Sequence, residues 1–341
     1  GTSVDESGNA ALDEAVIGEL VTYTLTVTVP EGTTKGVIVV DTMDPGLAFV
    51  DIVSVTPTAG VSSANTIGTG TNPSNVTIGN SGGGTGNRLT FDFGDITNTD
   101  TTNASADTIT IEYQAVVLNI TGNQDIDPTA LDNTADLAYS WTDDTPDADP
   151  GSDTLTASAD EVTVVEPNLT VDKQASDDNS SYTNSLTGVD AGDTVYYRIR
   201  ITNGAGGPTA YDLDLSDEIP SALGSLAVTS VALTNAAGAA GGTISVTDGG
   251  PNTLDTSDFT FSGNTLQLNG GRNIDLGPDS RLEIIVEGVL DYSVNPGEDI
   301  DNTANITWTS LDGTPGQRST HNTDSTERTG TFDDSDPLNN Y

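Results

Sequence analysis

The stretch GELVTYTLTVTV, from Gly18 to Val29, occurs a second time in altered form as GDTVYYRIRITN, from Gly192 to Asn203. Both stretches place apolar residues at every second position, as a half-buried β-strand does. Three further pairs of similar stretches follow in the same order along the chain. They are GVIVVDTMDPGL with AYDLDLSDEIPSAL, TITIEYQAVVLN with RLEIIVEGVLDY, and LDNTADLAYSWTDDTP with IDNTANITWTSLDGTP. The preserved order predicts two homologous domains built from strands.

Turn-rich segments such as GNSGGGTGN and NAAGAAGG separate the strand-like stretches. No window shows an apolar stripe with helical spacing. Short strands separated by turns, in domains of this size, indicate an all-β fold of two tandem Ig-like antiparallel β-sandwich domains. We expect the first domain at residues 1–164 and the second at 165–326, with the junction in VVEPNLT. The acidic segment 327–341 is expected to be a linker toward a further repeat or subunit.

The chain has 52 acidic residues against nine basic ones, and its formal net charge is −43. A surface this negative argues against nucleic acid or an anionic membrane as partner, because both need a positive counter-surface. No cysteine is present, so neither a disulfide nor thiol chemistry is expected. No stretch reaches transmembrane length, and no charged-then-apolar leader begins the sequence. We therefore expect a soluble interior piece or a mature chain.

The sequence offers little for catalysis on an external substrate. His321 is the only histidine, so no Ser/His/Asp arrangement and no histidine metal cluster is expected. The glycine-rich loops lack the Gly-Lys-Ser/Thr ending of a phosphate-binding loop. Trp141 and Trp308 stand at equivalent positions of the two copies, which favours a core role over a sugar-binding platform. The sequence therefore predicts a protein that is not an enzyme.

The second copy resembles a known family in its motifs. AGDTVYYRIRITNGAGGPTAYDLDLSDEIPSAL followed by GEDIDNTANITW resembles the bacterial cell-surface repeat domain with the pattern GdxVxYxIxVxN, xxDxlPxxL and NtA. It is also similar to the isopeptide-forming shaft domains of Gram-positive fimbriae. Both copies match, so the resemblance spans nearly the whole chain. It implies an extracellular stalk, adhesin or filament subunit, with neighbouring copies or repeats of the same protein as partners.

In those shaft domains a first-strand lysine bonds covalently to a last-strand asparagine with the help of a buried acid. The resemblance places these groups on Lys173, Asn302 and Asp217. Strand alternation independently puts all three on inward faces. Burial lowers the pKa of an amine and raises that of a carboxyl, as the reaction needs. Two alternatives stay open: a buried Lys–Asp ion pair beside Asn302, or a one-residue register slip that exposes the lysine.

The first copy offers an internal control. Its SVDESG lines up with TVDKQAS of the second copy, so Glu6 stands at the place of Lys173. Asp41 and Asn133 are retained at the positions of the acid and the asparagine. Because no amine is present, we expect the first copy to lack the cross-link.

Acidic clusters predict calcium as a cofactor, because calcium takes six to eight oxygen ligands. A solvated acidic loop is the alternative for each cluster, and no cluster has the EF-hand spacing. The candidate ligands are Asp125 and Asp127 in NQDID, and Asp143, Asp144, Asp147, Asp149 and Asp153 in WTDDTPDADPGSD. Sequons mark Asn75, Asn179 and Asn305 as candidate glycosylation sites, although chance explains most sequons in a chain rich in Asn and Thr.

The main alternative to a structural module is a calcium-dependent carbohydrate- or surface-binding module, with a surface glycan as partner. Polymerisation of subunits by strand exchange is a further variant, because an exposed sheet edge permits it. In each case the expected location is extracellular, on the cell surface or in a secreted filament.

Overall fold

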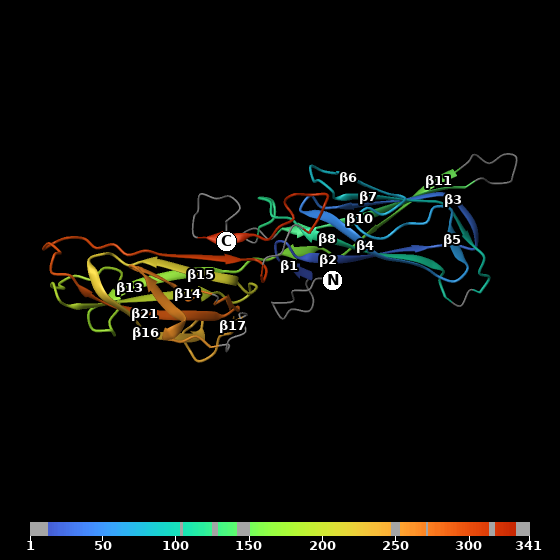
Figure 1. Cartoon of the computed structure of the whole chain (residues 1–341). Helices are drawn as coiled ribbons and strands as arrows, with labels where there is room; N and C mark the ends of the chain where they lie inside the picture. The colour runs from blue at the N-terminus through green and yellow to red at the C-terminus, as the bar shows by residue number, and fades with distance from the viewer. Residues whose placement is uncertain are drawn as a thin grey trace. The chain divides into compact units, whose positions relative to one another are not determined.

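The computed structural model describes residues 13–102, 105–124, 129–141, 151–246, 253–270, 272–313 and 318–331. Contacts divide these residues into two compact units, of which the first comprises 13–165 and 318–327 and the second 166–313 and 328–331. Regular structure in the described ranges is all β-strand, apart from one short 3-10 turn at Thr256–Asp258. The predicted all-β class is confirmed (Figure 1). None of the described ranges contains a helix with the length and apolarity needed to cross a membrane.

The first unit is a sandwich of two main sheets with a small third sheet. One main sheet has β8 (Thr108–Val117) between β2 (Leu20–Thr28) and β4 (Leu47–Pro57). The other runs in the order β11 (Gly151–Ser158), β10 (Asn133–Trp141), β3 (Gly32–Met43), β7 (Arg88–Asn98) and β5 (Val61–Ser63), with β6 (Val76–Gly79) also paired to β7. The small sheet contains β1 (Asp13–Ala15), β12 (Val162–Val164) and β9 (Ala130–Leu131). Phe91 of β7 and Ile111 of β8 share one buried core, so the main sheets pack face to face.

The second unit repeats this plan. One sheet runs in the order β13 (Leu169–Ser176), β14 (Thr194–Asn203), β21 (Ser280–Leu290) and β16 (Leu223–Asn235). The other runs β18 (Phe259–Ser262), β19 (Thr265–Leu268), β15 (Tyr211–Glu218), β22 (Ala304–Thr309) and β23 (Thr329–Thr331), and β17 (Ile244–Val246) pairs with β20 (Ile274–Leu276). Ile199 of β14, Leu215 of β15 and Trp308 of β22 meet in its core. This core position of Trp308 agrees with the expectation from the sequence.

Alternation of side chains explains why these segments form strands. Burial changes at every residue along β14 and β21, so alternate side chains enter the core. The two units share the equivalent strands that the sequence repeat predicts, but they differ at one sheet edge. In the second unit β13 pairs with the outer edge of β14, whereas no described strand pairs with the outer edge of the equivalent β2.

A polar segment near the end of the sequence, residues 318–327, belongs to the first unit. The Ser319 hydroxyl donates to the Phe49 carbonyl at 2.6 Å, and the Asn322 amide donates to the Thr85 carbonyl at 2.9 Å. The His321 ring lies 2.8 Å from the Thr71 carbonyl. These side chains satisfy backbone groups of the first unit, which fixes the segment there. The expected second domain, 165–326, includes this segment, whereas the contacts group it with the first unit.

Candidate functional site

Lys173 lies in the middle of β13, opposite Ile199 of β14. Its side chain is 10% exposed, and its ammonium lies 5.3 Å from the centre of the Tyr197 ring. Leu169 and Val171 precede it at period two, and Leu169 is buried. The strand therefore turns this lysine toward the interior of the second unit.

Asp217 provides the partner of this lysine. It follows Leu213 and Leu215 on the inward face of β15, and its side chain is 0% exposed. The Lys173 Nζ donates to the Asp217 Oδ1 at 2.6 Å, while the Asp217 Oδ2 is buried without a hydrogen-bond partner. The structure thus brings together an amine and a carboxyl that are 44 residues apart in sequence.

Asn302 borders the same space. It lies two residues before Ala304 of β22, which pairs with Asp217 of β15. A cavity of about 270 Å³ is lined by Lys173, Tyr197 and Asn302, among others. Both polar atoms of the Asn302 side chain, Oδ1 and Nδ2, are buried and have no hydrogen-bond partner. Such an unpaired buried amide is rare in folded proteins, because it loses its bonds to water without replacement.

Burial shifts both titrating groups toward their neutral forms. It lowers the pKa of the Lys173 ammonium from 10.5 to about 8, even though attraction to Asp217 opposes the shift. It raises the pKa of the Asp217 carboxyl above 3.8, with Lys173 again opposing the shift. With a pKa of about 8, roughly one lysine in ten is neutral at pH 7, and a neutral amine is nucleophilic.

The first unit has a related cluster without a lysine. Asp41 in β3 is 2% exposed, and burial raises its pKa to about 7. The Tyr113 hydroxyl donates to the Asp41 Oδ2 at 2.9 Å, and the Asn133 Nδ2 donates to that hydroxyl at 2.6 Å. Sequence reasoning identified Asp41 and Asn133 but missed Tyr113. Its signal was the alternation that places Tyr113 opposite Tyr23 on the inward face of β8. Glu6, expected at the place of the lysine, lies outside the described residues.

Most of the other predicted site residues lie outside the described part of the chain. Asp125, Asp127, Asp143, Asp144, Asp147 and Asp149 lie outside the described residues. The remaining predicted calcium ligand, Asp153, accepts a hydrogen bond from the Thr154 N–H in β11. Of the sequon residues, Asn75 donates to the Thr66 carbonyl, Asn179 accepts from the Tyr182 hydroxyl, and Asn305 is exposed on β22. Their roles in metal binding and glycosylation stay predictions.

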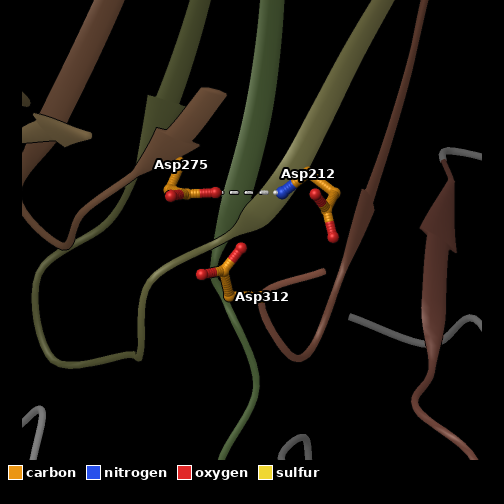
Figure 2. A group of neighbouring side chains, drawn as sticks. All are labelled: Asp212, Asp275 and Asp312. Carbon is orange, nitrogen blue, oxygen red and sulfur yellow. Dashed lines mark hydrogen bonds between the residues drawn. The ribbon is translucent and has the colours of Figure 1, made fainter. Parts of the chain in front are cut away.

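A different acidic group appears in the second unit, formed by Asp212, Asp275 and Asp312 (Figure 2). Their nearest carboxylate oxygens all lie within 4.8 Å of one another. Burial, and to a smaller extent the charges of Asp312 and Asp212, raise the pKa of Asp275 to about 6. Both Asp212 oxygens already accept hydrogen bonds, from Asn273 and from Thr309. Sequence spacing could not reveal this group, because the fold assembles it from three separate segments.

No family model matches the sequence, and no curated protein matches it. Solved structures to which the chain is similar include the C-terminal domain of the antigen I/II-family protein AspA of Streptococcus pyogenes. That likeness has 13% identity, covers 87% of this chain and 90% of that one, and has a TM-score of 0.41. The C-terminal domain of the antigen I/II polypeptide BspA of Streptococcus agalactiae shows 14% identity, 88% and 92% coverage, and a TM-score of 0.41. A C-terminal fragment of the major pilin GBS80 of Streptococcus agalactiae shows 13% identity, 87% and 80% coverage, and a TM-score of 0.32.

Proposed function

We propose that the chain is a structural module of an extracellular adhesin, stalk or filament, and that its second unit forms an amide bond between Lys173 and Asn302. The observation that carries this proposal is the buried, unpaired amide of Asn302 at the cavity that holds Lys173. Leaving such a group unpaired costs free energy. Reaction with a neighbouring amine removes the unpaired amide and replaces it with a covalent link.

The chemistry uses the neutral forms that burial favours. Protonated Asp217 donates a hydrogen bond to the Asn302 carbonyl and makes its carbon more electrophilic. The neutral Lys173 Nζ attacks this Cγ, a new C–N bond forms, and the bond from Cγ to Nδ2 breaks. The Nζ loses one proton, which leaves with the departing amino group as ammonia. The chain therefore loses one nitrogen and three hydrogens, and no oxidant or cofactor is needed.

The position of the bond suits a mechanical role. Lys173 lies in the first strand of the second unit, and Asn302 lies two residues before β22 of the opposite sheet. An amide between them ties the two sheets of the sandwich and closes most of the unit into one loop. Without cysteine, the chain has no disulfide that could do the same.

The remaining parts of the proposal follow from composition and fold. Tandem β-sandwich units with a large negative charge suit an extended, soluble surface structure that associates with neighbouring copies or repeats. In this proposal the protein catalyses no reaction on an external substrate. Calcium bound at acidic loops, and a surface glycan as ligand, stay predictions.

The test is the intact mass of the purified chain, measured beside two variants. Wild type is expected to lack the mass of one ammonia, and Lys173→Ala is expected to show its full mass. Lys35→Ala is the matched control, because it removes the other lysine of the chain, which pairs with Asp95 at the surface. This control should retain the deficit. A full mass for the wild-type chain would overturn the amide bond.

A further inference from the structure

The two units differ at one core position near their acid and asparagine. In the second unit this position is Val286 of β21, which pairs with Tyr197 of β14. In the first unit it is Tyr113 of β8, which pairs with the equivalent tyrosine, Tyr23 of β2. Val286 and Tyr113 are both buried in the core of their unit. Equivalent strands therefore place a valine in one unit where the other has a tyrosine.

Tyr113 engages the two groups that correspond to the acid and the asparagine of the second unit. Its hydroxyl donates to the Asp41 Oδ2 at 2.9 Å and accepts from the Asn133 Nδ2 at 2.6 Å. A tyrosine hydroxyl can donate and accept at the same time, so it binds both groups without a charged partner. The hydroxyl thus lies between the carboxyl and the amide, which in the proposed reaction must bond to each other.

Val286 leaves the corresponding groups of the second unit available. A valine side chain has no polar atom, so it forms no hydrogen bond with the acid or the amide. Within the described part of this unit, the Asp217 Oδ2 and both polar atoms of the Asn302 side chain have no hydrogen-bond partner. Protonated Asp217 is therefore free to donate to the Asn302 carbonyl, as the proposed reaction requires.

The surroundings of the two positions match, so a tyrosine at position 286 should reach the acid. β21 lies between β14 and β16, as β8 lies between β2 and β4. Tyr197, the neighbour of Val286 across the strand pair, lies 5.3 Å from the Lys173 ammonium, measured from the ring centre. Tyr197 also lines the cavity that Asn302 borders. Position 286 is thus close to all three groups of the proposed amide site.

We propose that this core position determines which unit can form the amide: Val286 leaves Asp217 and Asn302 free to react, whereas Tyr113 binds Asp41 and Asn133. The inference rests on the proposed amide bond and names a residue on which its formation depends. It gives the first unit a second barrier to cross-linking, in addition to its lack of a lysine at the aligned position.

The experiment measures the intact mass of the folded, purified chain carrying Val286→Tyr or Val286→Ile. Val286→Tyr is expected to lose the ammonia deficit of wild type, because the new hydroxyl binds Asp217 and Asn302. Val286→Ile is the matched control, since it enlarges the same core side chain without adding a polar group, and it should retain the deficit. A deficit that persists in Val286→Tyr, or that is also lost in Val286→Ile, would overturn the inference.

A second pair of variants tests the first unit and covers the case that Val286→Tyr does not fold. Glu6, which lies outside the described residues, aligns with Lys173 in the sequence. Glu6→Lys alone should leave the deficit at one ammonia, since Tyr113 still binds the acid and the asparagine. Glu6→Lys combined with Tyr113→Val should raise the deficit to two. A second loss in Glu6→Lys alone, or in neither variant, would contradict the role of Tyr113.

The wild-type mass separates this inference from the proposed function. A full mass for the wild-type chain would overturn the amide bond and this inference with it. A wild-type deficit that Val286→Tyr retains would overturn the inference alone and leave the amide bond in place.

Discussion

Replacing Lys173 and Asp217 together distinguishes a covalent amide bond from a buried ion pair. Replacing Lys173 alone, as in Lys173→Met, does not distinguish them, because both arrangements predict a large loss of stability. If the amide exists, the variant loses a cross-link around about 130 residues, and the loss is roughly 4 to 5 kcal/mol in the chain-entropy model. If only an ion pair exists, the variant leaves Asp217 buried without its partner, at a cost of about 3 to 5 kcal/mol.

The double variant Lys173→Met/Asp217→Val gives different results in the two models. Replacing a buried ion pair with apolar side chains is often neutral, or stabilising by about 1 to 4 kcal/mol. A lost cross-link is not restored by such packing. With the amide, we therefore expect the double variant to unfold roughly 10 to 20 °C below wild type, since each kcal/mol shifts Tm by about 2 to 4 °C in a unit of this size.

Differential scanning calorimetry of the chain and its variants measures this shift, with Lys35→Met as control. The side chains of Lys35 and Asp95 are 54% and 43% exposed, so replacing Lys35 should leave Tm nearly unchanged. A double variant that unfolds at or above the wild-type temperature would refute the cross-link and leave a buried ion pair in its place.

Three further predictions concern other parts of the chain. Because burial raises the pKa of Asp41 from 3.8 to about 7, the folded first unit keeps a proton that the unfolded chain releases. The free energy of unfolding should therefore fall by roughly 4 kcal/mol as the pH rises from the lower of these pKa values to the higher. If the urea midpoint of Asp41→Asn falls as much over this pH range as that of wild type, Asp41 is not the group responsible. Gly330→Ala should destabilise the second unit by about 1 to 3 kcal/mol, because the added Cβ overlaps the Trp308 ring. Gly224→Ala is the control, since a Cβ at Gly224 meets open space. Equal denaturation midpoints for the two variants would count against this packing. Calcium at the acidic loops should raise Tm and a chelator should reverse the rise, whereas identical melting curves would exclude calcium as a stabilising ion.

Alternation along the strands gave the most reliable information. It predicted the all-β class, the equivalent strands of the two copies, and the inward faces of Lys173 and Asp217. Such predictions succeed because side-chain direction depends only on local backbone geometry. The amide bond itself stays a prediction, since a face assignment does not say which reaction occurs there.

Features that depend on distant segments escaped sequence reasoning. Tyr113 reads as one more apolar residue of its strand, and only the folded unit shows its hydroxyl between Asp41 and Asn133. The acidic group around Asp275 requires a register shift in β15 between Tyr211 and Asp214, which alternation cannot foresee. Long-range packing decides both, and it leaves no period in the sequence.

The segment 318–327 has a consequence for the order in which the protein folds during synthesis. The first unit needs Ser319 and Asn322 to satisfy the backbone of Phe49 and Thr85, yet about 150 residues of the second unit are synthesised before them. At typical rates of about 5 to 20 residues per second, the ribosome needs roughly 8 to 30 seconds for that stretch. The unit that begins first therefore stays incomplete until most of the second unit has been synthesised, and the nascent chain must keep its incomplete surface soluble in the meantime.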